Sequence, residues 1–170
     1  MARTASVTQY AFTARPLTSR PNLLRGNSST RNVIALISVR LCSRSRMREV
    51  TVNGIEEVKQ AIDAASGRIF ILFTGSKIDG KSWCPDCVVA EPVVESVVHS
   101  DEGRTLDATF ITCFVGARDY WKSPTCPFRT DPAFKLNCVP TLVEYGKKHK
   151  RLTEGQLTNA DLLKDFFVDS

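Results

Sequence analysis

Two cysteines three residues apart, Cys84 and Cys87, stand at the junction between a strand-like run and a helical pattern. The run before them, residues 68–73, reads RIFILF, and such continuous apolar stretches are typical of strands buried on both faces. The polar loop 74–82 follows and leads directly into Cys84. A cysteine pair at the first turn of a helix after a buried strand favours an α/β architecture with a redox site.

The chain after Met47 alternates between strand and helix patterns. The strand candidates are residues 48–52, 68–73, 108–115, 142–145 and 150–152. The helix candidates are residues 53–67, 88–99, a short segment at 131–136, and a last helix capped by Thr158. In the second helix Val89, Val93 and Val97 are spaced as a core-facing stripe. This order predicts an α/β fold with a central mixed β-sheet and helices on both faces.

The spacing of the cysteine pair predicts thiol–disulfide exchange. Backbone N–H groups and the positive dipole end at a helix start favour a thiolate at Cys84, and Pro85 suits the first turn because its missing N–H is no loss there. Cys87 lies one turn further on, so the two sulfurs can close a disulfide. The Cys84 thiolate would attack a substrate disulfide and Cys87 would release the product. Trp83 would supply an apolar face for the substrate.

Half of a structural zinc site is the main alternative for the cysteine pair. Such a site needs a second pair of ligands, and the remaining candidates stand singly in the sequence: Cys113, Cys126, Cys138, His99 and His149. We therefore favour redox chemistry and expect no bound metal. The alternative functions are a binding module that senses redox state and an interaction domain stabilised by zinc.

Residues 1–46 differ in composition from the rest of the chain. They hold eight Arg, seven Ser and five Thr with no Lys, Asp or Glu, a charge of +8. The other 15 basic residues stand against 18 acidic ones, so residues 47–170 carry −3. The first segment is typical of a transit peptide, and a disordered extension or a functional start at Met47 are the alternatives. We expect residues 47–170 to form the folded domain, whose charge argues against nucleic-acid binding.

The longest apolar run of the first segment, residues 33–39, is far shorter than the roughly 20 residues of a membrane-spanning helix. We therefore expect no membrane contact. The expected location is the cytosol, or the mitochondrion if residues 1–46 act as a transit peptide. The expected state is a monomer.

Several motifs resemble the thioredoxin domain-containing protein 17 family, also called 14 kDa thioredoxin-related proteins, whose plant relatives are called Clot. These motifs are FTGSK at 73–77, GKSWCPDC at 80–87, AEPVV at 90–94, YWK at 120–122, FKL at 134–136 and VPTL at 139–142. The resemblance covers nearly all of residues 47–170 and none of residues 1–46. It implies a thioredoxin-like fold.

The resemblance also implies a protein-disulfide reductase with Cys84 as the nucleophile and Cys87 as the resolving cysteine. Electrons would come from NADPH through thioredoxin reductase, with no bound cofactor. Disulfide-containing proteins or cystine-like small disulfides would be the substrates, and peroxidase activity is a further implication. A cis-proline opposite the motif would fall on Pro140. The expected substrate-binding residues are Trp83, Trp121, Val139 and Pro140.

Two positions depart from ordinary thioredoxins. Pro85-Asp86 stands where their WCGPC motif has Gly-Pro, and Leu72 stands where they carry a buried aspartate on the preceding strand. An acid between the cysteines opposes thiolate formation, yet it can relay a proton to a leaving thiol. The proton-transfer task therefore falls to Asp86 or Glu91, and we hypothesise Asp86 as the third catalytic residue.

Overall fold

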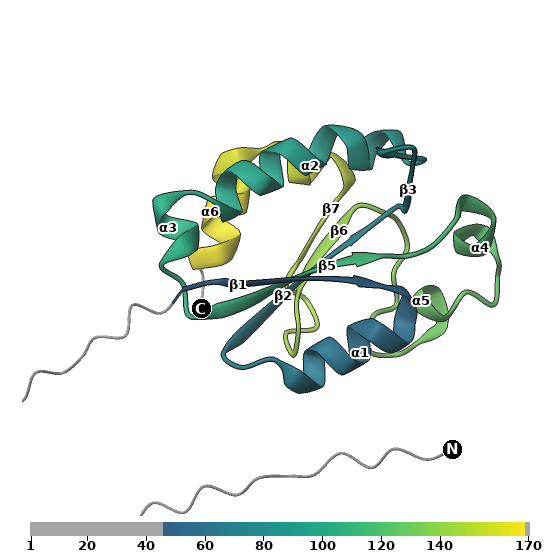
Figure 1. Ribbon diagram of the computed structural model, residues 1–170, viewed down its shortest axis with the longest axis horizontal. Coiled ribbons are helices and arrows are strands. Elements are labelled where there is room, and N and C mark those ends of the chain that lie inside the picture. The colour runs from purple at the N-terminus through teal and green to yellow at the C-terminus, as the bar shows by residue number, and fades with distance from the viewer. Residues whose placement is uncertain (1–45, 169–170) are drawn as a thin grey trace, which may run out of the picture. The chain divides into compact units, whose positions relative to one another are not determined.

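The computed structural model describes residues 46–168, in which strands and helices alternate along the chain (Figure 1). The strands are β1 (Arg48–Asn53), β2 (Arg68–Thr74), β3 (Lys77–Ile78), β4 (Lys81–Ser82), β5 (Ala108–Phe114), β6 (Thr141–Glu144) and β7 (Arg151–Thr153). The helices are α1 (Gly54–Ala64), α2 (Pro85–Val98), α3 (Asp101–Arg104), α4 (Arg118–Lys122), α5 (Pro127–Thr130), η1 (Glu154–Thr158) and α6 (Ala160–Val168). None of these helices is long and apolar enough to cross a membrane. The predicted transit segment lies outside the described residues, apart from Arg46.

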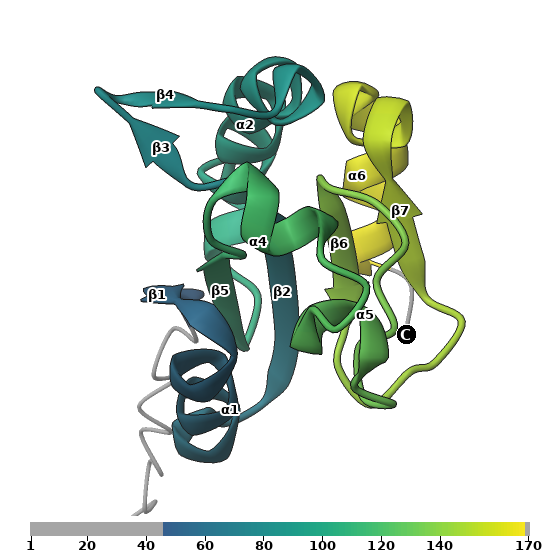
Figure 2. The same ribbon diagram turned by 90° about the vertical axis from the view of Figure 1, so that its right-hand side faces the viewer.

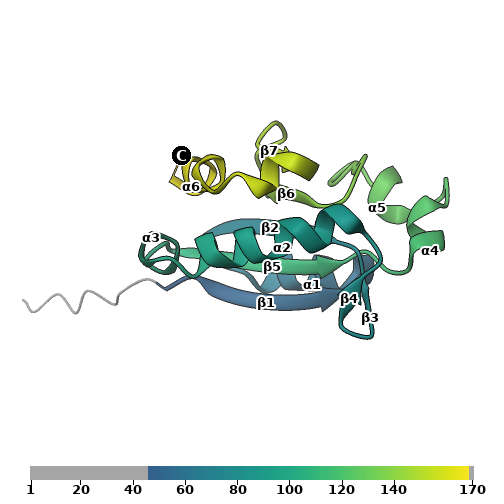
Figure 3. The ribbon, with the colours of Figure 1, turned by 90° about the horizontal axis from the view of Figure 1, so that it is seen from above.

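Five strands form one mixed sheet in the order β1-β5-β2-β6-β7, which Figure 3 shows from above. Strands β1, β5 and β2 run parallel, whereas β6 runs antiparallel to β2 and β7 runs antiparallel to β6. In the middle of the sheet Leu72 of β2 lies opposite Leu142 of β6. The predicted α/β class with a mixed central sheet is confirmed.

Alternate side chains of β2 enter two separate cores, one on each face of the sheet. Phe70 and Leu72 pack in the core that α2 and α6 cover, whereas Ile71 and Phe73 pack in the core that contains residues of α1 and α5. Figure 1 shows α2 and α6 on one side of the sheet and α1 on the other. This alternation follows from the two-residue period of a strand, and it confirms that helices cover both faces.

The buried face of α2 differs from the predicted one. Val89 is 59% exposed, so the stripe predicted over Val89, Val93 and Val97 is wrong at its first position, whereas Val97 is buried as predicted. The buried residues of the helix are Cys87, Ala90, Val94, Val97 and Val98. Helix α2 packs on the sheet through the face that begins with Cys87. Relative to the predicted orientation the helix is rotated about its axis, and the second cysteine of the motif lies between the helix and the sheet.

The predicted polar loop 74–82 contains a small hairpin of β3 and β4. Its two turn residues, Asp79 and Gly80, both adopt positive φ (52° and 80°). An Asp-Gly pair in this conformation is the favoured connection for a tight hairpin. In Figure 2, which faces the N-terminal end of α2, the hairpin and α4 lie on the same side of the molecule as that end.

Two further local predictions are wrong. Residues 131–136 form a turn rather than a helix, because the Asp131 carboxylate accepts the Ala133 N–H at 2.8 Å and closes a local loop. Helix α6 is capped by Asn159 rather than Thr158. The Asn159 side-chain oxygen accepts two backbone N–H groups of the first turn, at 3.0 and 3.2 Å.

Candidate active site

Cys84 is the N-cap residue of α2. Its backbone is extended (φ −96°, ψ 113°), and Pro85 occupies the start of the helix. The Cys84 sulfur accepts the Cys87 N–H at 3.3 Å, and the Cys84 thiol donates to the Val139 carbonyl, also at 3.3 Å. Because unpaired N–H groups at a helix start stabilise negative charge, this position suits a thiolate nucleophile.

Cys87 lies one turn further along α2 and is only 1% exposed. Its sulfur accepts the Gly75 N–H at 3.4 Å. Burial raises the pKa of Cys87 to about 12, and the hydrogen bond with Cys84 acts in the same direction, whereas hydrogen bonds with Thr74 and Gly75 lower the pKa by less. Both thiols are free. The two cysteines therefore differ: one stands at the helix tip, and the other holds its proton in the core.

Gly75 lets the motif lie close against the end of β2. A methyl group at this position would lie 2.8 Å from the Ser82 hydroxyl and 2.9 Å from the Trp83 ring. The Ser82 hydroxyl donates to the Gly75 carbonyl (3.0 Å) and accepts the Cys84 N–H (3.3 Å). The Trp83 indole N–H donates to the Gly116 carbonyl at 2.9 Å. These bonds fix Trp83 and Cys84 against the carboxyl ends of β2 and β5.

The loop before β6 completes the site from a distant part of the sequence. The Val139–Pro140 peptide bond is cis, as the family resemblance implies. The Thr141 hydroxyl donates to the Cys138 carbonyl at 2.8 Å and supports the turn. The loop thereby brings the Val139 carbonyl to the Cys84 sulfur, although the two residues are 55 positions apart.

A cavity of about 290 Å³, here called the Cys84 cavity, opens beside the first cysteine. Five predicted site residues line it: Trp83, Cys84, Asp86, Trp121 and Val139. Cys84 itself is only 4% exposed, and the cavity borders it. Pro140 and Cys87 do not line it and instead line a separate groove between α2 and the sheet. The structure thus divides the predicted residues between two hollows.

Three charged residues that were not among the predicted site residues also line the Cys84 cavity: Arg118, Lys122 and Glu154. Arg118 and Lys122 are four residues apart on α4, and this spacing puts them on one helix face. Trp121, a predicted site residue, lies on the same helix beside Lys122. The sequence signal for the two cations is therefore their i, i+4 spacing next to Trp121. With Asp86, the lining of the cavity carries both signs of charge.

The other described cysteines do not add a metal site. Within residues 46–168 no three His, Cys, Asp or Glu side chains lie close enough together to hold a metal ion. Cys113 and Cys126 are buried free thiols, and burial raises the pKa of Cys113 to about 12. The described residues therefore give the zinc alternative no ligand set.

The sheet order, the cysteine pair at the start of α2 and the cis-proline beside it define a domain of the thioredoxin superfamily, a superfamily of redox proteins. Residues 51–169 match the family described as thioredoxin domain-containing protein 17-like, thioredoxin domain. The chain belongs to this family, which confirms the resemblance seen in its motifs.

Named relatives agree with this assignment. Thioredoxin domain-containing protein 17 of Homo sapiens is 46% identical over 128 residues, which cover 74% of this chain and 98% of the human protein. Thioredoxin-like protein Clot of Oryza sativa subsp. japonica is 37% identical over 105 residues, 58% of this chain and 76% of the rice protein. The solved structure of a mutant thioredoxin from Halobacterium salinarum is 22% identical with a TM-score of 0.46, over 71% of this chain and 88% of that one. The family assignment rests on the sequence matches and not on this last likeness.

Proposed function

We propose that this protein is a thiol–disulfide oxidoreductase that reduces disulfides with Cys84 and Cys87. The observation that carries the proposal is the 3.3 Å hydrogen bond from the Cys87 N–H to the Cys84 sulfur at the start of α2. It puts the first sulfur at a helix N-terminus and the second cysteine one turn below it. Membership of a thioredoxin-superfamily family supports the redox role.

In the first half-reaction, the Cys84 thiolate attacks one sulfur of the substrate disulfide. The substrate S–S bond breaks, a mixed disulfide forms on Cys84, and the departing thiolate takes up a proton. Asp86 lines the same cavity as Cys84. We propose that Asp86 relays this proton to the departing sulfur.

In the second half-reaction, Cys87 loses its proton and attacks the Cys84 sulfur. The mixed disulfide breaks, the second substrate thiolate leaves, and a Cys84–Cys87 disulfide remains. The substrate has gained two electrons and the protein has lost two. NADPH acting through thioredoxin reductase is the proposed source of the electrons that restore the dithiol, a choice that rests on the family.

The Cys84 cavity is the proposed entry for the substrate disulfide. Trp83 and Trp121 supply apolar walls, and the Val139–Pro140 turn brings a backbone carbonyl to the reacting sulfur. Helix α4 contributes Arg118 and Lys122 to the lining, so access to Cys84 is restricted on that side. This enclosure supports disulfide-containing proteins with an accessible bond and cystine-like small disulfides as substrates.

Consumption of NADPH in the presence of thioredoxin reductase and cystine tests the proposal on the full chain. Steady turnover is expected for the unaltered protein and for Cys113→Ala, which removes a buried thiol outside the Cys84 cavity. Turnover at the background rate is expected for Cys84→Ser. Equal rates for Cys84→Ser and the unaltered protein would overturn the reductase function.

Two variations of this assay address the alternatives. Reversible oxidation of the cysteine pair without any NADPH consumption, on cystine or on a protein disulfide, would instead identify a redox-sensitive binding module. Hydrogen peroxide in place of cystine tests the expected peroxidase activity.

A further inference from the structure

The resolving step requires an acceptor for the Cys87 proton, and the Cys84 cavity does not provide one. Cys87 must lose its proton before it attacks the mixed disulfide, because the thiolate is the nucleophile. Its side chain is buried at 1% exposure, and burial raises its pKa to about 12. Asp86 lines the Cys84 cavity, but it does not line the groove that reaches Cys87. A different group must therefore receive the Cys87 proton.

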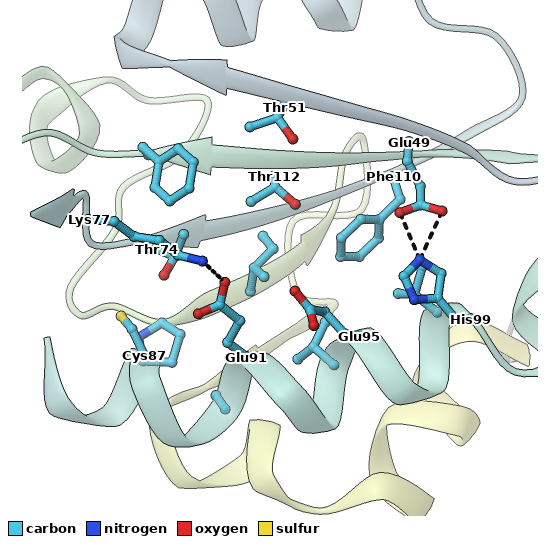
Figure 4. Close-up of a pocket in the computed structure, with 16 residues that line it drawn as sticks. Glu49, Thr51, Thr74, Lys77, Cys87, Glu91, Glu95, His99, Phe110 and Thr112 are labelled. Carbon is cyan, nitrogen blue, oxygen red and sulfur yellow. Dashed lines mark hydrogen bonds and ion pairs between the residues drawn. The ribbon is translucent and has the colours of Figure 1, made fainter. Parts of the chain in front are cut away.

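The second hollow, here called the Cys87 groove, offers a route for that proton. It has a volume of about 230 Å³ and lies between α2 and the face of the sheet formed by β1, β5 and β2. The Cys87 side chain lines one end of it, and the hydroxyls of Thr51, Thr74 and Thr112 line its sheet side (Figure 4). The groove is thus roomy enough for water and has polar groups to bind it.

Glu91 is the carboxylate of this groove nearest to Cys87 along α2. The two residues are four apart, so their side chains lie on the same helix face. Helical side chains lean toward the N-terminus of their helix, which directs Glu91 back toward Cys87. Figure 4 shows Glu91 at the groove with Lys77 of β3 extended toward it, and the two form an ion pair. The Glu91 side chain is 34% exposed, so it contacts solvent as well as the groove.

The other titratable groups of the groove are further from Cys87 along α2, on another element, or paired with Glu91. The titratable residues that face it are Glu49, Lys77, Cys87, Glu91, Glu95 and His99. His99 and Glu49 contact one another at 3.1 Å at the far end of α2. Glu95 is two turns from Cys87, and Lys77 is already paired with Glu91. The i, i+4 position of Glu91 therefore separates it from the other acids of the groove.

We propose that Glu91 accepts the Cys87 proton through water in the Cys87 groove during the resolving step, an inference that rests on the reductase function proposed above. The Cys87 S–H bond breaks, and its proton passes to the Glu91 carboxylate. The sulfur electron pair forms the bond to Cys84, while the bond between Cys84 and the substrate sulfur breaks and its electrons leave with the substrate thiolate. Glu91 then returns the proton to solvent. The only oxidant required is the substrate disulfide.

Each carboxylate thereby serves one half-reaction. Asp86 acts on the first departing thiolate from the Cys84 cavity, and Glu91 acts on Cys87 from the groove. Lys77 is a positioning residue in this scheme, because its ammonium holds the Glu91 side chain at the groove. The β3–β4 hairpin that bears Lys77 consequently contributes to the second half-reaction through Glu91.

A single-turnover reaction of the reduced full chain with one equivalent of 5,5′-dithiobis(2-nitrobenzoic acid) separates the two steps. The first thionitrobenzoate is released when Cys84 attacks, and the second is released when Cys87 resolves the mixed disulfide. In Glu91→Gln, the first release is expected to keep its rate and the second to slow about 100-fold at neutral pH, the low end of general-base effects. The defect should shrink as the pH rises, since hydroxide then removes the proton.

Glu95→Gln is the matched control, because it removes the same charge from the same groove and helix at twice the distance along the chain. Its two releases should match those of the unaltered protein. Lys77→Met should slow the second release by less than Glu91→Gln does, and Glu91→Asp should restore part of the rate.

Three results would overturn the inference: a second release in Glu91→Gln as fast as in the unaltered protein, an equal defect in Glu95→Gln, or a defect independent of pH. A failure of the proposed function itself looks different. In that case the unaltered protein would show no release that depends on Cys84.

Discussion

Two buried ionisable groups near opposite ends of strand β6, Cys87 and Glu144, have pKa values shifted in opposite directions. The strand begins at Thr141, directly after the cis-proline, and ends at Glu144. Near its start, burial raises the pKa of Cys87 to about 12. At its end, burial would raise the pKa of Glu144, yet hydrogen bonds from three cationic side chains lower it to about 2.

The partners of the two groups account for the difference. Arg68 contacts both oxygens of the Glu144 carboxylate, at 3.0 and 2.8 Å, and Lys150 and Lys147 lie 2.9 and 3.2 Å from it. Two such bonds from one guanidinium are among the strongest that a carboxylate makes. The hydrogen bonds described for Cys87 come instead from neutral groups, such as the Gly75 N–H. The cationic partners of Glu144 stabilise its buried negative charge, so this group has a structural role. The neutral partners of Cys87 leave the thiol protonated, so its proton must be removed during the reaction.

Replacing Cys87 by serine should abolish turnover, because Cys87 is the buried group that takes part in the reaction. A serine hydroxyl cannot close a disulfide with Cys84, so each chain should stop after forming one mixed disulfide. Mass spectrometry should show the substrate adduct on Cys84, and NADPH consumption should fall to background. Sustained turnover in Cys87→Ser would show that Cys87 is not the resolving residue.

Replacing Glu144 by glutamine should lower the stability of the fold and leave the reactivity of Cys84 unchanged. We expect the free energy of unfolding to fall by about 3 kcal/mol, because the change leaves Arg68 and its neighbours without their buried counter-charge. Urea denaturation measures the loss, and the exposed Glu95→Gln serves as the control. The first thionitrobenzoate release should keep its rate in both variants. A change in that rate, or equal stability of the two variants, would contradict the division between the sites.

Acid should remove the Glu144 contribution in a defined pH range. Its folded pKa of about 2 lies below the ordinary value of 4.5, so the contribution is complete above pH 4.5 and declines as the pH falls toward 2. The stability gap between the unaltered protein and Glu144→Gln should narrow by about 2 kcal/mol between pH 7 and pH 3. Urea midpoints measured across this range test the expectation. A gap that stays constant would show that the carboxylate is not stabilised by its cations.

Gly75→Ala should disturb the packing of the cysteine motif against β2 without changing any charged residue. The added methyl would meet the Ser82 hydroxyl and the Trp83 ring, and such overpacking typically costs about 1–3 kcal/mol. It should also slow alkylation of Cys84, because Trp83 and Cys84 must shift. Gly155→Ala is the control, since nothing lies within 4 Å of a methyl group there. Equal behaviour of the two variants in denaturation and alkylation would contradict the close packing of the motif on β2.

Asp86→Asn should have the smallest effect. Asp86 is exposed at the Cys84 cavity, so solvent competes with it as a proton donor, and we expect turnover at neutral pH to fall by less than the roughly 100-fold that marks the low end of general acid–base effects. The pH dependence of turnover should change shape at the same time. An unchanged profile would remove Asp86 from the proposed mechanism.

The sequence was sufficient to predict the elements that local patterns define. The apolar run of β2, the proline after Cys84 and the alternation of strands and helices predicted the α/β fold and the start of α2. The rotation of α2 could not be predicted from its valines, because Ala90 and Val94 pack on the sheet and leave Val89 exposed.

The missing parts of the site depend on contacts between distant segments. Arg118 and Lys122 reach the Cys84 cavity only because α4 packs beside the motif, 34 residues after Cys84 at the nearer end. Lys77 reaches Glu91 only because an Asp-Gly turn folds the loop into a hairpin. The i, i+4 spacing of Arg118 and Lys122 indicates that they share a helix face, but no local pattern predicts either contact between distant segments.

Alkylation of the reduced full chain by iodoacetamide at pH 7, followed site by site with mass spectrometry, compares the reactivity of the two cysteines. Cys84, at the N-terminus of α2, should react faster than free cysteine, while Cys87 should stay unmodified over the same period. Reaction of Cys84 no faster than free cysteine, or modification of Cys87 before Cys84, would contradict this expectation.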